Sequence, residues 1–337
     1  MKILKNGMKL YFTLPEGLSS YDFSKHEEAI KQSLDARKID FYYANNDVII
    51  ELTNDILESE YTFKVVKCKM KVPILIGHSY NKIEIVDLSI GEPHMLIAGE
   101  SGSGKSTILR AIITNLICTS KVRLHLIDLK NGAEFSVFEK CKNIASFSKN
   151  IQEAEKILYM LNSEIDKRYN LFYSKNVVDI QEYNNRYSNE KLKREIVIID
   201  EFADLKSEKN SIDILETLSA KARACGIHLI ISTQRPDSNI LNGRIKANIP
   251  RCIALKTMND VNSRIIIGHN GLETLRGKGH GILRNEGKEI EIQGMNITPQ
   301  QARDLVSLHY IKKITHKLNK KKEKQGEIVD LGFLNKF

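Results

Sequence analysis

The turn between residues 99 and 107 constrains the fold of this chain more than any other stretch. Four of its positions match the spacing G-x-x-x-x-G-K-[ST], namely Gly99, Gly104, Lys105 and Ser106. An apolar run at residues 95–98 precedes the turn, and apolar residues recur at helical spacing over residues 108–117. Glycine lets backbone N–H groups approach an anion closely, so a strand, such a turn and a helix in this order predict a phosphate-binding loop.

The loop is expected to hold the phosphates of ATP. The residues assigned to nucleotide binding are Gly99, Glu100, Ser101, Gly102, Ser103, Gly104, Lys105, Ser106 and Thr107. Lys105 is expected to reach the β- and γ-phosphates, and the Ser106 hydroxyl is expected to ligate Mg²⁺. A glycine turn with a solvated lysine is the alternative interpretation, and the strand and helix on either side argue against it.

Two adjacent carboxylates end another apolar strand. The β-branched run at residues 196–199 is apolar enough to lie inside a sheet, and Asp200 and Glu201 follow it directly. Open α/β sheets bind ligands at the carboxyl ends of their strands, so both acids are expected beside the phosphate loop. We expect Asp200 to join the Mg²⁺ shell and Glu201 to orient and polarise the attacking water. An acidic pair at a strand end often caps a helix, but a phosphate loop in the same chain favours the catalytic interpretation.

Two further side chains flank the apolar run at residues 228–233. Gln234 follows that strand and is expected to sense the γ-phosphate or to position water. Arg223 ends the helix before the strand, on a surface that can face a neighbouring subunit and stabilise transition-state charge in trans. Taken alone, Arg223 would be an ordinary solvated residue at a helix C-terminus.

Composition excludes several classes of protein. The 337 residues are 42% hydrophobic, enough for a sizeable core. No apolar run approaches the roughly 18 residues of a membrane span, and the N-terminus lacks a signal-peptide core, so we expect a cytoplasmic protein. The 5 cysteines form no C-x-x-C pair, which argues against a zinc site or a disulfide framework. The formal net charge of +9 favours a polyanionic partner.

The sequence pattern divides the chain into three parts. Residues 1–70 are expected to form a small α/β module, with a helix at residues 24–37 that Ser24 caps. Residues 71–297 alternate strands with helices, which predicts a mostly parallel sheet covered on both faces. Residues 298–337 are expected to be a basic helical tail, whose lysines contact phosphates or an anionic membrane surface, or else form a solvated face.

Individual elements follow from apolar periodicity. Strands are expected at residues 10–14, 41–52 (interrupted by a turn at 45–47), 73–77, 83–88, 95–98, 122–128, 196–200, 228–233 and 252–257. A helix with one apolar face is expected at residues 151–173. The polar segment at residues 183–193 is expected to be a surface loop.

Several segments together resemble the FtsK/SpoIIIE DNA translocases. They are residues 93–105, 126–130, 168–169, 200–205, 221–236, 245–250 and 263–264. The runs KARACGIHLIISTQRP and GRIKANIP are specific to that family. The resemblance implies a RecA-like P-loop ATPase motor that forms a hexameric ring and pumps double-stranded DNA. It also implies that Arg223 is an arginine finger and that Arg264 contacts nucleotide at the subunit boundary.

Departures from the family narrow the expected role. The family motif GxGDML is replaced by GKGHGIL at residues 277–283, and the membrane spans and winged-helix module of chromosomal members do not fit in this chain. The resemblance therefore points to the coupling ATPases of mobile elements. These imply a relaxase, a secretion channel or a membrane as further partner, with peripheral membrane attachment through that partner. Two alternatives stay open: a type VII secretion ATPase, which moves protein, and a nucleotide-dependent DNA-binding module that does not pump.

Overall fold

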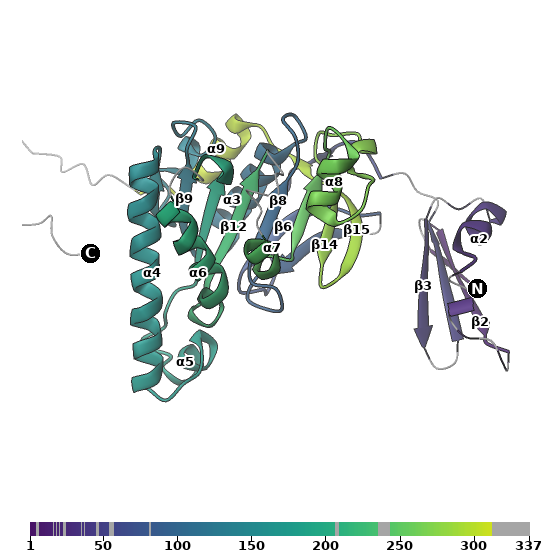
Figure 1. The fold of residues 1–337 in the computed structure, drawn as a ribbon, viewed down its shortest axis with the longest axis horizontal. Helices are drawn as coiled ribbons and strands as arrows, with labels where there is room; N and C mark the ends of the chain where they lie inside the picture. The colour runs from purple at the N-terminus through teal and green to yellow at the C-terminus, as the bar shows by residue number, and fades with distance from the viewer. Residues whose placement is uncertain are drawn as a thin grey trace, which may run out of the picture.

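The computed structural model describes residues 1–4, 7–15, 17, 19, 21–22, 25–34, 36, 38–44, 47–53, 57–80, 82–205, 209–234 and 243–311. These residues form a large α/β body with two apolar cores and a small N-terminal module with a core of its own (Figure 1). None of the helices in these ranges is long and apolar enough to cross a lipid bilayer.

A 10-stranded sheet forms the centre of the large body. Its strands are β6 (Pro73–His78), β7 (Ile83–Asp87), β8 (Met95–Ala98), β9 (Arg123–Asp128), β10 (Ile144–Ser148), β11 (Glu195–Asp200), β12 (Ile227–Thr233), β13 (Cys252–Leu255), β14 (His280–Asn285) and β15 (Lys288–Gln293). In space they follow the order β10-β9-β11-β12-β8-β13-β14-β15-β6-β7. Neighbours from β10 to β13 are parallel, and neighbours from β13 to β7 are antiparallel. The predicted mostly parallel sheet is confirmed, with an antiparallel extension that the sequence pattern did not predict.

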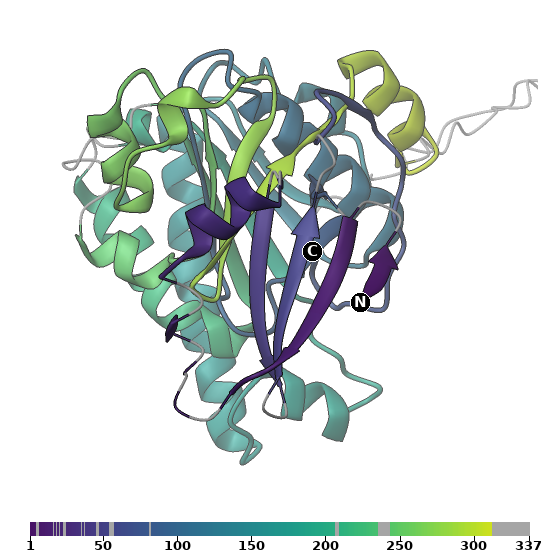
Figure 2. The same ribbon diagram turned by 90° about the vertical axis from the view of Figure 1, so that its right-hand side faces the viewer.

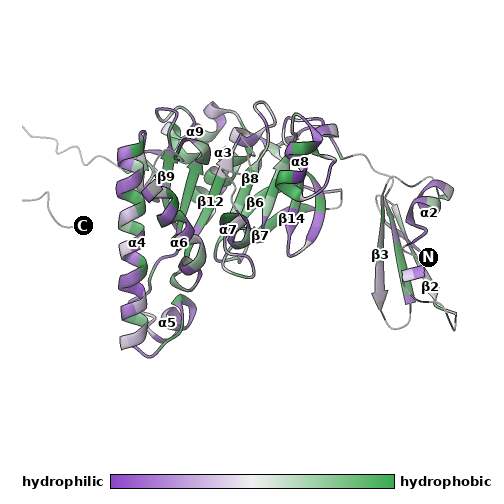
Figure 3. Ribbon diagram, viewed as in Figure 1, coloured by the Kyte–Doolittle hydropathy of each residue, from purple (hydrophilic) through white to green (hydrophobic). Residues whose placement is uncertain are grey.

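Helices cover both faces of this sheet (Figures 1 and 3). They are α3 (Lys105–Thr119), α4 (Ile151–Ser174), α5 (Ile180–Arg186), α6 (Lys209–Cys225), α7 (Gly243–Asn248), α8 (Asp260–Ile267) and α9 (Pro299–Ser307). Short 3-10 helices are Ser136–Phe138, Phe202–Leu205 and Leu272–Thr274. One apolar core packs α4 and α6 on one face, and a second packs α3 and α9 on the other.

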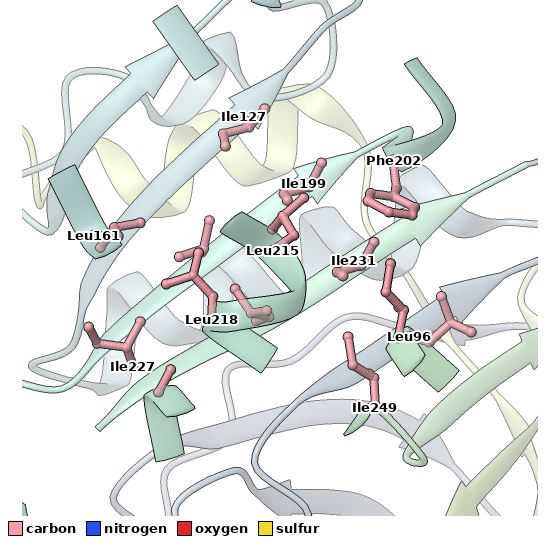
Figure 4. Close-up of a cluster of buried hydrophobic side chains, with 14 of the residues drawn as sticks. Leu96, Ile127, Leu161, Ile199, Phe202, Leu215, Leu218, Ile227, Ile231 and Ile249 are labelled. Atoms are coloured by element: carbon pink, nitrogen blue, oxygen red, sulfur yellow. The ribbon is translucent and has the colours of Figure 1, made fainter. Parts of the chain in front are cut away.

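Strand β11 shows why this sequence forms three layers. Its side chains alternate between the faces, with Ile196 and Ile198 in the core under α3 and Val197 and Ile199 in the core under α4 and α6. All four are fully buried. A strand that is apolar at every position is stable only between two layers of helices. Figure 4 shows Ile199 next to Leu215 of α6 in the second of these cores.

The small module is an antiparallel sheet with a helix beside it (Figure 2). Its elements are β1 (Lys2–Leu4), β2 (Gly7–Thr13), α2 (Glu27–Ser33), β3 (Lys38–Ala44) and β4 (Asp47–Thr53), in the strand order β1-β2-β4-β3. The predicted pairing of the two halves of the 41–52 segment is confirmed by β3 and β4. The helix begins only at Glu27, where His26 makes no side-chain cap. Ser24, the predicted cap, lies outside the described residues.

The structure corrects one prediction in the large body. The segment at residues 183–193, predicted as a surface loop, begins inside α5, and Tyr183 is buried. Asp179 caps α5 because its carboxylate accepts a hydrogen bond from the backbone N–H of Glu182 at 2.8 Å. The Tyr183 ring packs against Phe172 of α4, with 5.9 Å between the ring centroids. The segment is polar in composition, so its sequence did not indicate that Tyr183 would be buried. Its burial depends on the contact with Phe172, which belongs to another helix.

Segments on both sides of the predicted motor pack on the large body. Strand β5 (Tyr61–Thr62) pairs in parallel with β16 (Met295–Asn296). Helix α9 shares the apolar core of α3, and Cys141 and Tyr310 form an antiparallel bridge. We therefore propose that the motor domain runs from residue 57 to residue 311, beyond the 71–297 expected from the sequence. The lysine-rich remainder of the predicted tail lies outside the described residues.

Candidate active site

The phosphate loop follows β8, a central strand of the sheet. Since β8 lies between β12 and β13, strands on both sides can bring side chains to the loop. Gly104 is the N-cap of α3 and has a φ of 107°, which glycine adopts without the steric cost of a side chain. A Cβ at Gly104 would lie 2.3 Å from the backbone nitrogen of Gly279. The segment that contains Gly279 therefore packs so closely on the loop that only glycine fits at this position.

A cavity of about 530 Å³ adjoins this loop. Seven of the residues predicted from the sequence line it, namely Ser101, Gly102, Gly104, Lys105, Ser106, Thr107 and Gln234. Gly99, Glu100 and Ser103 belong to the same loop but are not among the lining residues. The remaining wall comes from Ile108, Lys130, Glu134 and the segments at residues 59–60, 278–279 and 293–296. The cavity thus joins parts of the chain that are far apart in sequence.

Lys105 carries a buried charge at this cavity. It is 5% exposed, and its ammonium donates a hydrogen bond to the backbone oxygen of Gly99 at 3.2 Å. Burial lowers the pKa of Lys105 to about 8, although the charges of Glu201 and Asp200 act in the opposite direction. Removing an ammonium from water is costly unless an anion pairs with it. The loop is therefore arranged to receive negative charge.

ATP binding is expected to be coupled to proton uptake by Lys105, because bound phosphates raise the pKa of a neighbouring ammonium. The pKa of Lys105 in the free protein is about 8, so ATP affinity should be highest below that pH and fall as the pH rises through it. Calorimetric titrations at about pH 8.5, in buffers of different ionisation enthalpy, would measure the uptake. Lys105→Arg is the control, since a guanidinium stays charged at this pH. Equal proton uptake by both proteins would contradict the assignment to Lys105.

Asp200 lies at the end of β11, next to the loop. It is 1% exposed, and burial raises the pKa of its carboxyl group, although the Lys130 ammonium at 3.4 Å opposes that shift. Glu201, which follows, is 4% exposed. Since both acids act electrostatically on Lys105, the structure brings the two predicted motifs into one site.

Glu201 is held in an uncommon backbone conformation by the strand next to it. Its φ of 61° lies in the left-handed region, which costs a non-glycine residue about 1–3 kcal/mol. Its carboxylate accepts hydrogen bonds from the Thr233 hydroxyl at 3.0 Å and from the backbone N–H of Gln234 at 3.1 Å. Both donors stand at the carboxyl end of β12, between β11 and β8. Thr233 was not among the predicted site residues, and its contact with Glu201 identifies it.

Lys130 is a second residue of the site that the sequence did not predict. It lines the cavity and pairs with Asp200. Asp128 shapes the turn that presents it, because its carboxylate accepts hydrogen bonds from the backbone N–H groups of Lys130, Glu134 and Phe135 at 3.2, 2.8 and 2.9 Å. The available signal was an apolar strand ending in Asp-Leu-Lys, which resembles the ending of β11.

The two arginines assigned by resemblance do not line this cavity. Arg223 stands in the last turn of α6, just before β12, whereas Gln234 follows the end of β12. The 7 residues of β12 span about 20 Å at the usual rise per residue, so Arg223 and Gln234 lie near opposite ends of this strand. Arg264 lies on α8 and pairs with Asp260 at 3.0 Å. The phosphate loop is thus out of reach for the Arg223 side chain of the same chain.

The groups around the cavity fit a triphosphate with its Mg²⁺. The Ser103 hydroxyl is buried and has no hydrogen-bond partner within the described ranges, and the Lys105 ammonium is buried beside it in the loop. The Ser106 hydroxyl and the Asp200 carboxylate offer the oxygen ligands that Mg²⁺ takes together with phosphate and water. The donor set therefore matches the chemistry predicted from the sequence.

Comparison with known proteins connects this site to a family. The sequence profile of the FtsK/SpoIIIE family matches residues 55–238, more than half of the chain. The chain belongs to the FtsK/SpoIIIE family. This membership confirms the resemblance inferred from the sequence.

Two curated relatives of this FtsK/SpoIIIE protein extend beyond the region that it matches. A DNA translocase FtsK from Staphylococcus epidermidis is 33% identical over 281 residues, which cover 78% of this chain and 34% of the relative. A DNA translocase FtsK from Caldanaerobacter subterraneus is 33% identical over 308 residues, which cover 83% of this chain and 43% of the relative. The chain thus spans about a third to two fifths of these relatives.

Two solved structures have a similar fold. The pCW3 conjugation coupling protein TcpA, in its monomer form with ATPγS, superposes with a TM-score of 0.70 at 25% identity over 91% of both chains. The cytoplasmic domain of the type VII secretion ATPase EccC from Thermomonospora curvata superposes with a TM-score of 0.63 at 20% identity, over 72% of this chain and 32% of that one. The second likeness concerns the fold alone.

Proposed function

We propose that this FtsK/SpoIIIE ATPase uses ATP and Mg²⁺ to translocate double-stranded DNA, as a homo-oligomeric and specifically hexameric ring. The observation that carries the proposal is the division of the site. Lys105 interacts electrostatically with Asp200 and Glu201 at the carboxyl ends of the strands. In contrast, Arg223 lies at the opposite ends of the strands, just before β12. A site that needs all four is complete only when a second copy supplies the arginine, which a closed ring does for every subunit.

Side chains of the phosphate loop and of the carboxyl end of β11 would divide the proposed hydrolysis among them. The loop N–H groups and Lys105 would bind the phosphates. Ser106 and Asp200 would hold Mg²⁺, which when bound neutralises charge on the β- and γ-phosphates. Glu201 would accept the proton of the attacking water, since the hydrogen bonds from the end of β12 keep its carboxylate in one orientation.

Three residues would link hydrolysis to neighbouring parts of the ring. The backbone N–H of Gln234 contacts the Glu201 carboxylate while the residue lines the cavity, so Gln234 would sense the γ-phosphate. Arg223 of the neighbouring subunit would stabilise the charge that develops in the transition state. Arg264, exposed on α8, would contact nucleotide at the subunit boundary.

We favour DNA transfer of the mobile-element coupling type. The similarity to TcpA, a conjugation coupling protein, extends over 91% of both chains. The formal net charge of +9 suits a polyanionic substrate. In this role a relaxase, a secretion channel or a membrane-bound partner would deliver the DNA.

Duplex DNA is expected to raise the ATP turnover of the full chain severalfold. Removing the residues after Ile311, which include seven lysines from Lys312 to Lys324, should lower DNA affinity more than maximal turnover. The slope of log affinity against log salt should flatten by about 0.9 for each phosphate that the shortened chain leaves unneutralised. The measurement is the ATPase rate against DNA concentration at several salt concentrations. Turnover that DNA does not change would contradict the translocase and favour a protein-secretion motor, and bound ATP without turnover would favour a non-pumping module.

A further inference from the structure

The last turn of α6, which carries Arg223, is held by contacts at three of its backbone carbonyl groups. The Tyr169 hydroxyl donates to the oxygen of Lys221 at 2.9 Å, and the backbone N–H of Gly226 donates to the oxygen of Arg223 at 3.0 Å. The Arg168 guanidinium donates to the oxygen of Cys225 at 2.7 Å. The last four carbonyl groups of a helix lack intrahelical donors, and those of Arg223 and Cys225 are among them. Here side chains of α4 supply two of the three donors.

Arg168 ties this turn to the starts of two central strands. Its guanidinium, 4% exposed, donates to Glu195 of β11 at 2.5 Å and to the backbone oxygen of Lys193 at 3.1 Å. The other carboxylate oxygen of Glu195 lies 2.6 Å from Nε2 of His125 on β9. Burial by itself would raise the pKa of Glu195, but the hydrogen bond with His125 and the charge of Arg168 hold it below its ordinary value. The ionised Glu195 thus keeps the Arg168 fork in one orientation.

Gly226, which follows the last residue of α6, has little space around it and a backbone conformation that favours glycine. Its φ of 72° requires glycine, and a Cβ there would lie 2.6 Å from Cδ1 of Ile180 on α5. The helix end is therefore fixed by α4 on one side and by α5 on the other. In contrast, Arg223 itself is exposed. No ion pair or hydrogen bond of its guanidinium occurs among the residues that the structure places.

We propose that Arg168 and Tyr169 are positioning residues for Arg223, and that they hold the helix turn so that its guanidinium enters the active site of the neighbouring subunit. The inference rests on the proposed role of Arg223 in trans. A side chain that acts across a subunit boundary depends on its backbone being held within a fraction of an ångström. The observed arrangement combines a fixed turn with an exposed guanidinium, as this role requires.

The test separates the subunit that donates Arg223 from the subunit that donates the phosphate loop. In mixtures of Lys105→Ala and Arg223→Ala subunits, a working site combines the loop of an Arg223→Ala subunit with the arginine of a Lys105→Ala subunit. Adding Tyr169→Phe to the Lys105→Ala subunit should lower the turnover of the mixture about fivefold to tenfold, as expected when one hydrogen bond is removed. Adding it to the Arg223→Ala subunit should change little. The KM for ATP should stay the same in both mixtures.

A matched control is available on the same helix. Tyr173→Phe also removes one hydroxyl from α4, but Tyr173 is 90% exposed, so it should have no effect in either subunit. Arg168→Lys keeps the positive charge but loses the several N–H donors of the guanidinium. Like Tyr169→Phe, it should lower turnover when placed in the Lys105→Ala subunit and change little when placed in the Arg223→Ala subunit. Equal losses in both subunits would show a purely structural role and overturn the inference, as would no loss in either. Mixtures of the two parent subunits that form rings without any turnover would instead refute the trans role of Arg223 and this inference with it.

Discussion

Glu201→Gln should lower the rate of ATP hydrolysis about 10²- to 10⁴-fold while ATP still binds. The amide keeps the shape of the carboxylate and an oxygen that can accept the hydrogen bonds from Thr233 and Gln234. It has no negative charge with which to take a proton from water, so the chemical step alone is lost. The measurement pairs steady-state turnover with equilibrium binding of a fluorescent ATP analogue.

Two other variants calibrate this result. Lys105→Ala should lose turnover and nucleotide affinity together, because it removes the buried ammonium of the loop. Glu139→Gln is the matched control, since Glu139 is an exposed acid that pairs with Lys149 at 3.3 Å outside the cavity, and it should behave as the wild type. Near-wild-type turnover in Glu201→Gln would refute the assignment of Glu201 as the residue that activates water.

Arg223→Ala should lower the ATP turnover of the pure protein by at least about 10³-fold, as expected for an arginine finger supplied in trans. The loop and both acids of each subunit stay intact in this variant, so ATP should bind normally. Mixing it with Lys105→Ala subunits should restore part of the activity, because some interfaces then combine an intact loop with an intact arginine. Steady-state turnover across a series of mixing ratios would show a maximum at intermediate ratios.

The complementation is informative only if mixed rings form. Native mass spectrometry of the mixtures, with one variant carrying a tag, would establish their composition. Lys221→Ala is the matched control for Arg223→Ala, since it removes an exposed cation from the same turn of α6. Mixed rings that show no activity at any ratio would exclude a trans role for Arg223. A pure Arg223→Ala protein with normal turnover would exclude any catalytic role for it.

The spacing of apolar residues and glycines along the sequence was sufficient to predict the central part of the fold. The loop at residues 99–107, the apolar strand before Asp200 and the long amphipathic helix at residues 151–173 all appear at or near their expected positions. Each is specified by periodicity or turn chemistry within a few residues, and such local signals need no information about distant contacts. The short helix α5 was missed because its stability depends on Tyr183 packing against Phe172 of α4.

Long-range pairing decided how the parts of the site meet. The sequence indicated that Gln234 and Glu201 each follow a strand, but only the order β11-β12-β8 puts the end of β12, and with it Gln234, between Glu201 and the phosphate loop. The contacts of Thr233 with Glu201 and of Lys130 with Asp200 join residues 32 and 70 positions apart, and no periodicity encodes them. The antiparallel hairpins β14-β15 and β6-β7 likewise join the sheet through pairings between distant segments, β13 with β14 and β15 with β6. The local pattern therefore predicted which functional residues the chain carries. The order of the strands, which are buried on both faces of one sheet, brought these residues together at the carboxyl ends of the strands. The same order left Arg223 at the opposite end of β12.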